Sequence, residues 1–187
     1  MAKLIYINNM SLDGYFEDWH GAYDFGPMDD DVFMTYTDLL RPIGTFLYGR
    51  RLYETMAGWE TMPTLAAQSP LTAQFAEVWK ALNKIVYSAT LTTAPTANTR
   101  IERVFDATVV QQLKTDAGSD LAVGGANLAG QAMAAGLVDE RILFVWPTTV
   151  GEGKPALPTD ATYRFELLDE HRFINGTLLL RYRPRPA

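Results

Sequence analysis

The feature that most constrains the fold of this chain is a repeated alternation of short apolar runs with segments of helical periodicity. Apolar, β-favouring runs lie at residues 3–8, 45–48, 84–87, 101–104, 121–123 and 141–146. Between them, apolar residues recur at helical spacing at 29–40, from 49 to 56, and at 72–82, 107–114 and 127–135. Strands that alternate with helices indicate a mainly parallel sheet covered by helices on both faces.

The C-terminal part of the chain has a different pattern. Two strand-like runs, 163–168 and 177–182, flank Asn175-Gly176, a dipeptide typical of tight hairpin turns. Residues 18–29 are expected to form a loop, and Asp106 is expected to cap the helix that follows it. We therefore predict one α/β domain over 1–187, a three-layer fold with a twisted, mainly parallel sheet and a C-terminal antiparallel hairpin.

Composition excludes several classes of protein. The 187 residues suit one domain with its own core. No run approaches the roughly 18 apolar residues of a membrane span, and the N-terminal apolar run is too short for a signal peptide. With no cysteine and only two histidines, a thiolate or histidine-rich metal site is excluded. A net charge of -6 argues against a nucleic-acid partner. We expect a cytoplasmic protein with a small-molecule partner and no membrane association.

Two strand–glycine–helix junctions could bind an anion. In the first, Gly124 and Gly125 precede Ala126, Asn127 and Leu128. Paired glycines allow a close approach of the backbone to a ligand, and the N-terminus of the next helix favours phosphate. The alternative, equally weighted from these residues alone, is a tight turn with no ligand.

The second junction carries positive charge. Gly49 is followed by Arg50 and Arg51, whose guanidinium groups suit phosphate oxygens. A solvated basic helix start is the alternative, although cations are disfavoured at the positive end of a helix dipole. Ser88 and Thr90 follow a third strand, at the edge where α/β proteins bind ligands, or they cap the segment after it.

Sharper motifs are absent from the sequence. Ala126 occupies the second glycine position of a G-x-G-x-x-G pattern that would begin at Gly124, and residues 148–155 do not fit a phosphate-binding Walker loop. The acidic run Asp29-Asp30-Asp31 suits the first turn of a helix, or a proton relay. No serine nucleophile with a partner base is evident.

The order of these segments resembles the dihydrofolate-reductase superfamily, in particular the branch of the riboflavin-biosynthesis reductase domain, RibD C-terminal type. The segments that carry the resemblance are NNMSLDG (8–14), YGRRLYETM (48–56), KIVYS (84–88), VGGANL (123–128) and LVDE (137–140). They span 3–182 in the family's order. One departure is Val123, which stands where riboflavin-pathway reductases typically have a glutamate.

The resemblance implies that NADPH is the cofactor. It implies that Gly49, Arg50 and Arg51 face the adenosine side of NADPH, and that Ser88, with Thr90, meets its 2′-phosphate. Residues 124–128 would surround the pyrophosphate, and Asn9 would lie near the nicotinamide.

The resemblance also implies a reaction, hydride transfer to a small pterin- or aminopyrimidine-like heterocycle. In folate reductases a carboxylate at the start of the next helix supports protonation, and Asp31 is the nearest candidate. Asp13 could approach the ligand or only form its Asp-Gly turn. The alternative function is a non-catalytic nucleotide- or metabolite-binding protein on the same fold.

Related reductases often associate as homodimers through sheet edges. The C-terminal hairpin carries Leu178 and Leu180 on one alternating face, which would serve either a dimer interface or the core of the domain.

Overall fold

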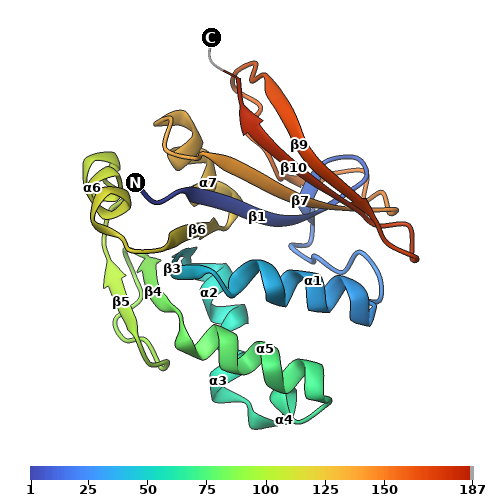
Figure 1. Ribbon diagram of the computed structural model, residues 1–187, viewed down its shortest axis with the longest axis horizontal. Coiled ribbons are helices and arrows are strands. Elements are labelled where there is room, and N and C mark those ends of the chain that lie inside the picture. Colours follow the sequence, from blue (N-terminus) through green and yellow to red (C-terminus); the bar gives the residue numbers. More distant parts are fainter. Residues whose placement is uncertain (186–187) are drawn as a thin grey trace.

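The computed structural model describes residues 1–185, which are built around an eight-stranded sheet (Figure 1). Its strands are β1 (Leu4–Ser11), β3 (Ile43–Gly49), β4 (Asn83–Tyr87), β5 (Thr99–Glu102), β6 (Asp120–Gly124), β7 (Glu140–Trp146), β9 (Phe165–Arg172) and β10 (Leu178–Pro184). They follow the order β5-β4-β3-β6-β1-β7-β10-β9. The strands from β5 to β7 are parallel to one another, whereas β10 is antiparallel to both β7 and β9. The predicted parallel sheet with an antiparallel hairpin is confirmed.

Helices cover both faces of the sheet, which confirms the three-layer prediction. The helices α1 (Asp30–Leu40), α2 (Arg50–Met56) and α5 (Pro70–Ala81) place Leu40, Tyr53 and Trp79 in one core cluster. On the other face, α6 (Ala107–Asp116) and α7 (Ala126–Ala134) contribute Val110 and Leu128 to a second cluster. The short helices α3 (Gly58–Thr61) and α4 (Pro63–Ala66) connect α2 to α5. As predicted, Asp106 caps α6, with its side chain accepting from the backbone N–H of Thr108 at 2.8 Å.

The sequence pattern does not predict two short strands, β2 (Tyr15–Asp18) and β8 (Gly153–Pro155). They pair with each other as a separate antiparallel ribbon. Strands of three and four residues carry almost no periodicity of their own, so only the pairing between distant segments reveals them. The approach is close, because a Cβ at Gly153 would lie 2.0 Å from the carbonyl oxygen of Glu17. Phe16, Glu17 and Lys154 of this ribbon line a cleft at the carboxyl ends of the parallel strands.

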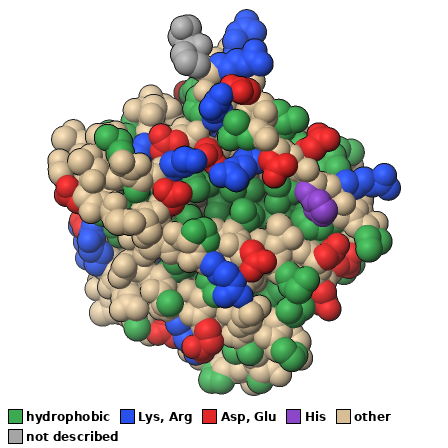
Figure 2. All heavy atoms as spheres, in the orientation of Figure 1, with side chains coloured by type: hydrophobic (Ala, Val, Ile, Leu, Met, Phe, Trp, Pro, Cys, Tyr) green, Lys and Arg blue, Asp and Glu red, His purple; other side chains and the backbone are tan. Residues whose placement is uncertain are grey.

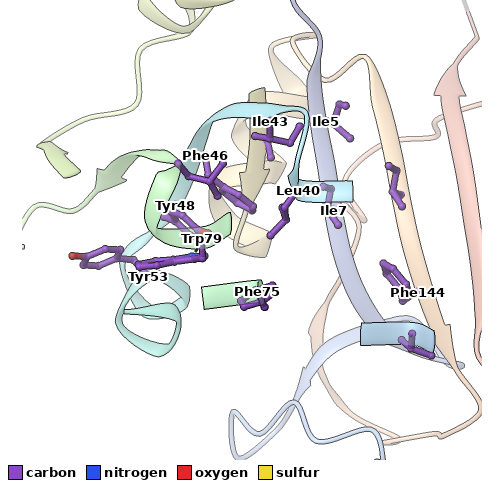
Figure 3. Packing of buried hydrophobic residues seen from close by; sticks show 14 of the residues in the cluster. Ile5, Ile7, Leu40, Ile43, Phe46, Tyr48, Tyr53, Phe75, Trp79 and Phe144 are labelled. Carbon is purple, nitrogen blue, oxygen red and sulfur yellow. Dashed lines mark hydrogen bonds between the residues drawn. The ribbon is translucent and has the colours of Figure 1, made fainter. Parts of the chain in front are cut away.

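Aromatic packing fixes the end of β3 (Figure 3). Tyr48 stacks on Phe46 with 4.1 Å between ring centroids, and its hydroxyl accepts a 2.9 Å hydrogen bond from Trp79 Nε1 on α5. Tyr48 and Trp79 are almost completely buried, and burial raises the pKa of Tyr48 well above its ordinary value. The helix α5 is thereby fixed against the strand that ends at Gly49.

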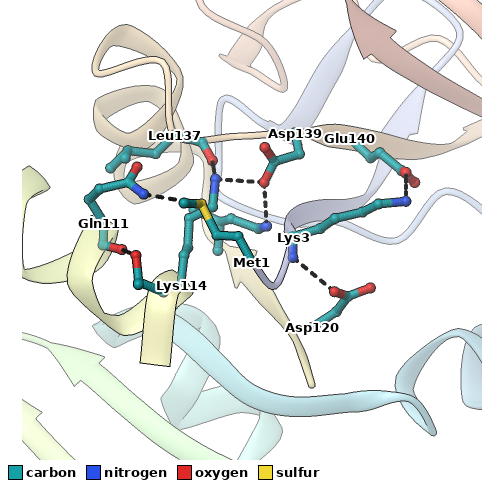
Figure 4. Close-up of polar contacts among 10 residues, drawn as sticks. Met1, Lys3, Gln111, Lys114, Asp120, Leu137, Asp139 and Glu140 are labelled. Atoms are coloured by element: carbon teal, nitrogen blue, oxygen red, sulfur yellow. Dashed lines mark hydrogen bonds and ion pairs between the residues drawn. The ribbon is translucent and has the colours of Figure 1, made fainter. Parts of the chain in front are cut away.

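Ion pairs and hydrogen bonds stabilise the amino ends of the parallel strands, at the end of the sheet opposite Gly49 (Figure 4). The buried Lys114 Nζ lies 2.6 Å from Asp139 Oδ2 and donates to the Leu137 carbonyl at 2.8 Å. The same Asp139 oxygen accepts from the backbone N–H of Leu4 at 2.7 Å. These contacts join α6, β1 and the segment before β7, and leave the carboxyl ends of the strands available for a site.

Replacement of Tyr48 by Phe is expected to destabilise the fold by about 1–3 kcal/mol, because the buried Trp79 N–H would lose its acceptor. Urea unfolding of the two proteins measures this difference. Tyr182→Phe is the control, since among residues 1–185 the half-buried Tyr182 hydroxyl has no hydrogen-bond partner. Equal losses in the two variants would contradict a special role for the Trp79–Tyr48 bond.

Candidate active site

Two adjoining cavities lie at the carboxyl ends of the central parallel strands. Ligands of open α/β sheets bind at this edge, where the loops after several strands converge. One cavity is a polar cleft of about 480 Å³, and the other is an apolar pocket of about 290 Å³. Phe16 and Leu52 line both of them, so the two spaces meet at these side chains.

The polar cleft gathers most of the residues that the sequence assigns to a cofactor. Eight of them line it: Gly49, Arg50, Arg51, Ser88, Gly125, Ala126, Asn127 and Leu128. They come from the ends of β3, β4 and β6 and from the first turns of α2 and α7. Their convergence depends on the parallel register that sets Tyr48 beside Gly124 and Gly49 beside Tyr87.

The N-terminus of α7 faces the cleft without a capping side chain. Its N-cap is Gly125, whose φ of 91° is a conformation that residues with a Cβ rarely adopt. A Cβ there would also lie 3.6 Å from the Cα of Gly49. Because no side chain caps α7, its first N–H groups can donate to an anion in the cleft.

Four cationic side chains line the same cleft. Arg50 and Arg51 come from α2, Arg103 follows β5, and Lys154 comes from β8. The buried Glu17 of β2 opposes them, with its Oε1 3.1 Å from Arg51 NH1 and 3.7 Å from Lys154 Nζ. The excess of positive charge in a chain with net charge -6 favours an anionic ligand at this place.

Ser88 and Thr90 occupy different positions. Ser88 lines the cleft, but its Oγ accepts from the backbone N–H groups of Thr90 and Leu91, at 3.3 and 2.9 Å. Thr90 is exposed and does not line the cleft. Arg103 reinforces this turn by donating to the Ser88 carbonyl at 3.0 Å. The Ser88 hydroxyl therefore stabilises the loop that borders the cleft.

Gly124 and Asn9 also lie outside the polar cleft. Gly124 is buried, and a Cβ there would lie 2.6 Å from Leu52 Cδ2, so this glycine permits packing of α2 on β6. Asn9 lines the apolar pocket, beside the residues that the two cavities share.

The apolar pocket is lined by aromatic and aliphatic side chains with few polar atoms. Its lining consists of Ile7, Asn8, Asn9, Phe16, Tyr23, Phe25, Gly26, Met28, Phe33, Tyr36, Leu52, Thr55, Met56, Trp59, Phe75 and Trp146. None of these residues, within the part of the chain that the structure describes, is an acid, a lysine, an arginine or a histidine.

Hydrogen bonding fixes the orientation of the Asn9 amide. Trp146 Nε1 lies 2.9 Å from Asn9 Oδ1, and an indole N–H can only donate. The amide oxygen must therefore face Trp146, which leaves the NH₂ group of Asn9 as a donor at the pocket wall. Tyr36 adds a hydroxyl, and burial raises its pKa to about 12, so it stays protonated at neutral pH.

The two candidate acids do not line the pocket. On α1, Phe33 and Tyr36 face it, and 100° per residue places Asp31 about 160° around the helix from Phe33. The carboxylate of Asp31 instead accepts from the N–H of Val32 at 2.9 Å. The structure therefore does not bring Asp31, the acid that the sequence suggested, into the lining of the apolar pocket.

Asp13 has a structural contact of its own. Its carboxylate accepts from the backbone N–H groups of Gly151 and Val150, at 2.7 and 3.2 Å, and it is exposed. The Ser11 side chain, followed by these N–H groups, lowers the pKa of Asp13. This contact connects the turn after β1 to the loop before β8.

Sequence reasoning did not identify Arg103, Lys154, Glu17 and Phe16 as part of the site. Arg103 lies inside the strand expected at 101–104, whereas β5 ends at Glu102, so the rule applied to Ser88 would have found it only with the strand end that the structure shows. The other three depend on the pairing of β2 with β8, for which the sequence gives no local indication.

Two kinds of feature, a metal-binding cluster and a membrane-spanning helix, are not found among the described residues. Within 1–185, no group of three or more His, Cys, Asp or Glu side chains is arranged to hold a metal ion. In the same range, no helix has both the length and the apolar character needed to cross a membrane.

Comparison with known proteins places this geometry in a family. A family model described as the RibD C-terminal domain matches residues 2–179. The uncharacterized protein YyaP of Bacillus subtilis (strain 168) is 32% identical over 180 residues, which cover 92% of this chain and 90% of that protein.

Solved structures share the fold at lower identity. A protein of Shewanella sp. PV-4, provisionally named for riboflavin biosynthesis, superposes with a TM-score of 0.76 at 18% identity, with full coverage of both chains. The deaminase/reductase of Thermotoga maritima, 5-amino-6-(5-phosphoribosylamino)uracil reductase by name, gives 0.67 at 13% identity, over 98% of this chain and 57% of its own. These likenesses show the dihydrofolate-reductase-like fold, and the match over residues 2–179 shows that the chain belongs to the RibD C-terminal domain family, a family of reductase-like domains.

Proposed function

We propose that this protein is an NADPH-dependent reductase that transfers a hydride to a small heterocycle of pterin- or aminopyrimidine-like character. The observation that carries the proposal is the junction of two complementary spaces. A cationic, glycine-lined cleft meets an apolar pocket at Phe16 and Leu52. A dinucleotide and a planar substrate require this combination, since one end is highly charged and the reacting rings need a dry environment.

The residues of the cleft fit NADPH. The uncapped N-terminus of α7 and the adjacent Gly49 offer a phosphate cradle that a Cβ at Gly125 would obstruct. Arg50 and Arg51 would neutralise the phosphates, and Arg103, beside Ser88, would meet the extra 2′-phosphate. When bound, NADPH supplies the hydride.

The residues of the apolar pocket would orient the substrate and exclude water. The amide NH₂ of Asn9 is positioned to donate to a carbonyl oxygen or ring nitrogen at the end of β1. No carboxyl group lines the pocket within residues 1–185, so no carboxylic acid of the pocket supplies the proton that accompanies the hydride. The polar groups of the pocket therefore serve mainly to position the substrate.

A non-catalytic binding protein is the second candidate, and the absence of an acid from the described pocket lining favours it. The two functions differ in one measurement. A reductase oxidises NADPH, observed as loss of absorbance, with at least one heterocycle of a substrate screen. A binding protein shows NADPH affinity but no oxidation with any of them.

We also propose a homodimer, formed through β9 at the edge of the sheet. Leu167 and Leu168 of this edge strand are 45% and 40% exposed, and the register between β9 and β10 shifts at Leu168. On β10, Leu179 faces the core, whereas Leu178 is exposed and Leu180 is half-buried, which supports a role of this face outside the core. Figure 2 shows hydrophobic side chains exposed among charged ones on one face of the molecule.

NADPH is expected to bind more tightly than NADH, and Arg50→Gln is expected to weaken NADPH binding about tenfold by removing a charged hydrogen bond to phosphate. Titration of nicotinamide fluorescence measures both effects. Arg41→Gln is the control, because Arg41 is exposed and pairs with Asp38 as Arg50 pairs with Glu54, but it lies outside the cleft. Equal affinity of the wild type for the two cofactors would contradict the assignment.

Gly125→Ala is expected to abolish measurable NADPH binding while it costs the fold about 1–2 kcal/mol, the penalty of a Cβ at positive φ. Gly136→Ala provides a control at another positive φ, 69°, because Gly136 does not line the cleft. Thermal unfolding should show a loss of stability in both variants, with NADPH affinity lost only in the first. Retention of affinity in Gly125→Ala would mean that the glycine serves only the turn.

Light scattering at micromolar concentration is expected to give about twice the 20.9 kDa mass of one chain. Leu168→Glu should reduce the mass to that of a monomer, because it places a charge in the proposed apolar interface. Val109→Glu, at an exposed position of α6, should leave the dimer intact. A monomeric wild type would refute the dimer.

A further inference from the structure

We propose that the apolar pocket selects an uncharged, planar, conjugated substrate and discriminates against relatives of the same ring that carry a phosphate or carboxylate. The proposal rests on the proposed function in one respect, namely that this pocket is the substrate side of the site. It narrows the substrate class of the proposed function from heterocycles in general to uncharged ones.

The described lining of the apolar pocket carries no charged side chain. The sixteen lining residues, all within the described part of the chain, include no ionised side chain at neutral pH, and burial keeps the Tyr36 hydroxyl protonated. Transfer of an ion into such a space is costly unless a countercharge or several donors compensate for its lost hydration. An anionic substrate would find no countercharge in this described lining, only neutral amide and hydroxyl donors.

The walls of the apolar pocket are largely aromatic, and the space between them is small. Phe33, Trp59 and Phe75 form one aromatic cluster, with ring centroids 4.7–6.0 Å apart. Aromatic walls bind flat, conjugated rings by stacking and edge contacts. The volume of about 290 Å³ is at the lower end of the range for ligand pockets, which limits the substrate to a small ring system without a long substituent.

The polar atoms that the apolar pocket offers to a ligand belong to neutral side chains. Tyr23 and Thr55 bond to each other at 3.0 Å, so these two hydroxyls are already partnered. The neutral donors that remain are the Asn9 NH₂ group, the Tyr36 hydroxyl and the buried Asn8 Nδ2, which has no partner among the described residues. A neutral donor suits a carbonyl oxygen or ring nitrogen far better than it compensates a full negative charge.

A groove that shares Tyr23, Leu52 and Thr55 with the pocket holds charged groups of both signs. The arginine there, Arg51, is paired with the buried Glu17 at 3.1 Å, and Glu54 borders the same groove. An anionic substituent that extended from the pocket into this groove would therefore meet two carboxylates beside one partnered arginine.

The test compares pterin with pterin-6-carboxylate by isothermal titration calorimetry, without NADPH. The two compounds share one ring system and differ in a single carboxylate. We expect pterin to bind at least about tenfold more tightly, as a buried ion without a partner should cost more than 1.4 kcal/mol. Equal or tighter binding of the carboxylate would overturn the proposal. Binding of neither compound would also overturn it, because the proposal requires the neutral one to bind.

A charge introduced at the pocket rim should reverse part of this selection. Thr55 is exposed and borders the pocket, so Thr55→Lys is expected to reduce the ratio of pterin to pterin-6-carboxylate affinity about fivefold. Thr55→Val controls for the loss of the Tyr23 bond, and Met34→Lys adds the same charge on α1 outside the pocket. If Thr55→Lys behaves like either control, charge does not govern selection and the proposal fails.

These titrations also separate the proposal from the proposed function. They report on the apolar pocket alone, whereas the reductase is tested by NADPH binding in the polar cleft and by NADPH oxidation. Failure of the NADPH titrations would remove the reductase and leave the preference for pterin as an independent result.

Discussion

The side-by-side alignment of β3 and β6 is the constraint on which the rest of the site depends. Parallel pairing places Tyr48 beside Gly124, and the next residues of both strands, Gly49 and Gly125, then turn into helices at the same edge. A Cβ on Gly125 would lie 3.6 Å from Gly49, so the two helix starts approach each other closely. Burial of Tyr48 and its bond to Trp79 keep β3 in this position. The cleft between the two helix N-termini is a consequence of this register.

The molecule separates its charges between two neighbouring spaces. An acidic chain concentrates Arg50, Arg51, Arg103 and Lys154 around one cleft, while the described lining of the adjacent pocket carries no charge. Long-range repulsion from the net charge is screened beyond about 10 Å at ordinary ionic strength, so the local cations dominate at the cleft. The pocket works by the opposite principle, because its low polarity penalises ions. This contrast supports a site that takes a charged cofactor at one end and a neutral ring at the other.

The position before the paired glycines, where the resemblance to riboflavin-pathway reductases implies a glutamate, is Val123, which lines neither cavity. Val123 is completely buried among apolar side chains of the core cluster under α6 and α7. A glutamate in that environment would be costly without a partner. The acids that the sequence offered for catalysis also lie elsewhere, since Asp13 joins two loops and Asp31 faces away from Phe33 on α1. In the proposed function the described lining of this pocket would position the ring without supplying a carboxyl group.

The sequence by itself determined the α/β class, the parallel sheet with its C-terminal hairpin, and the glycine and arginine junctions that line the polar cleft. These features are local, because periodicity, caps and strand-end glycines act within one turn or one strand. The tertiary structure alone decided that β2 and β8 pair, which brings Phe16, Glu17 and Lys154 to the site. It also decided which face of α1 meets the pocket, and therefore that Phe33 and Tyr36, but not Asp31, line it. The physical reason is that long-range pairing and helix rotation depend on the packing of the whole chain, which no short segment encodes.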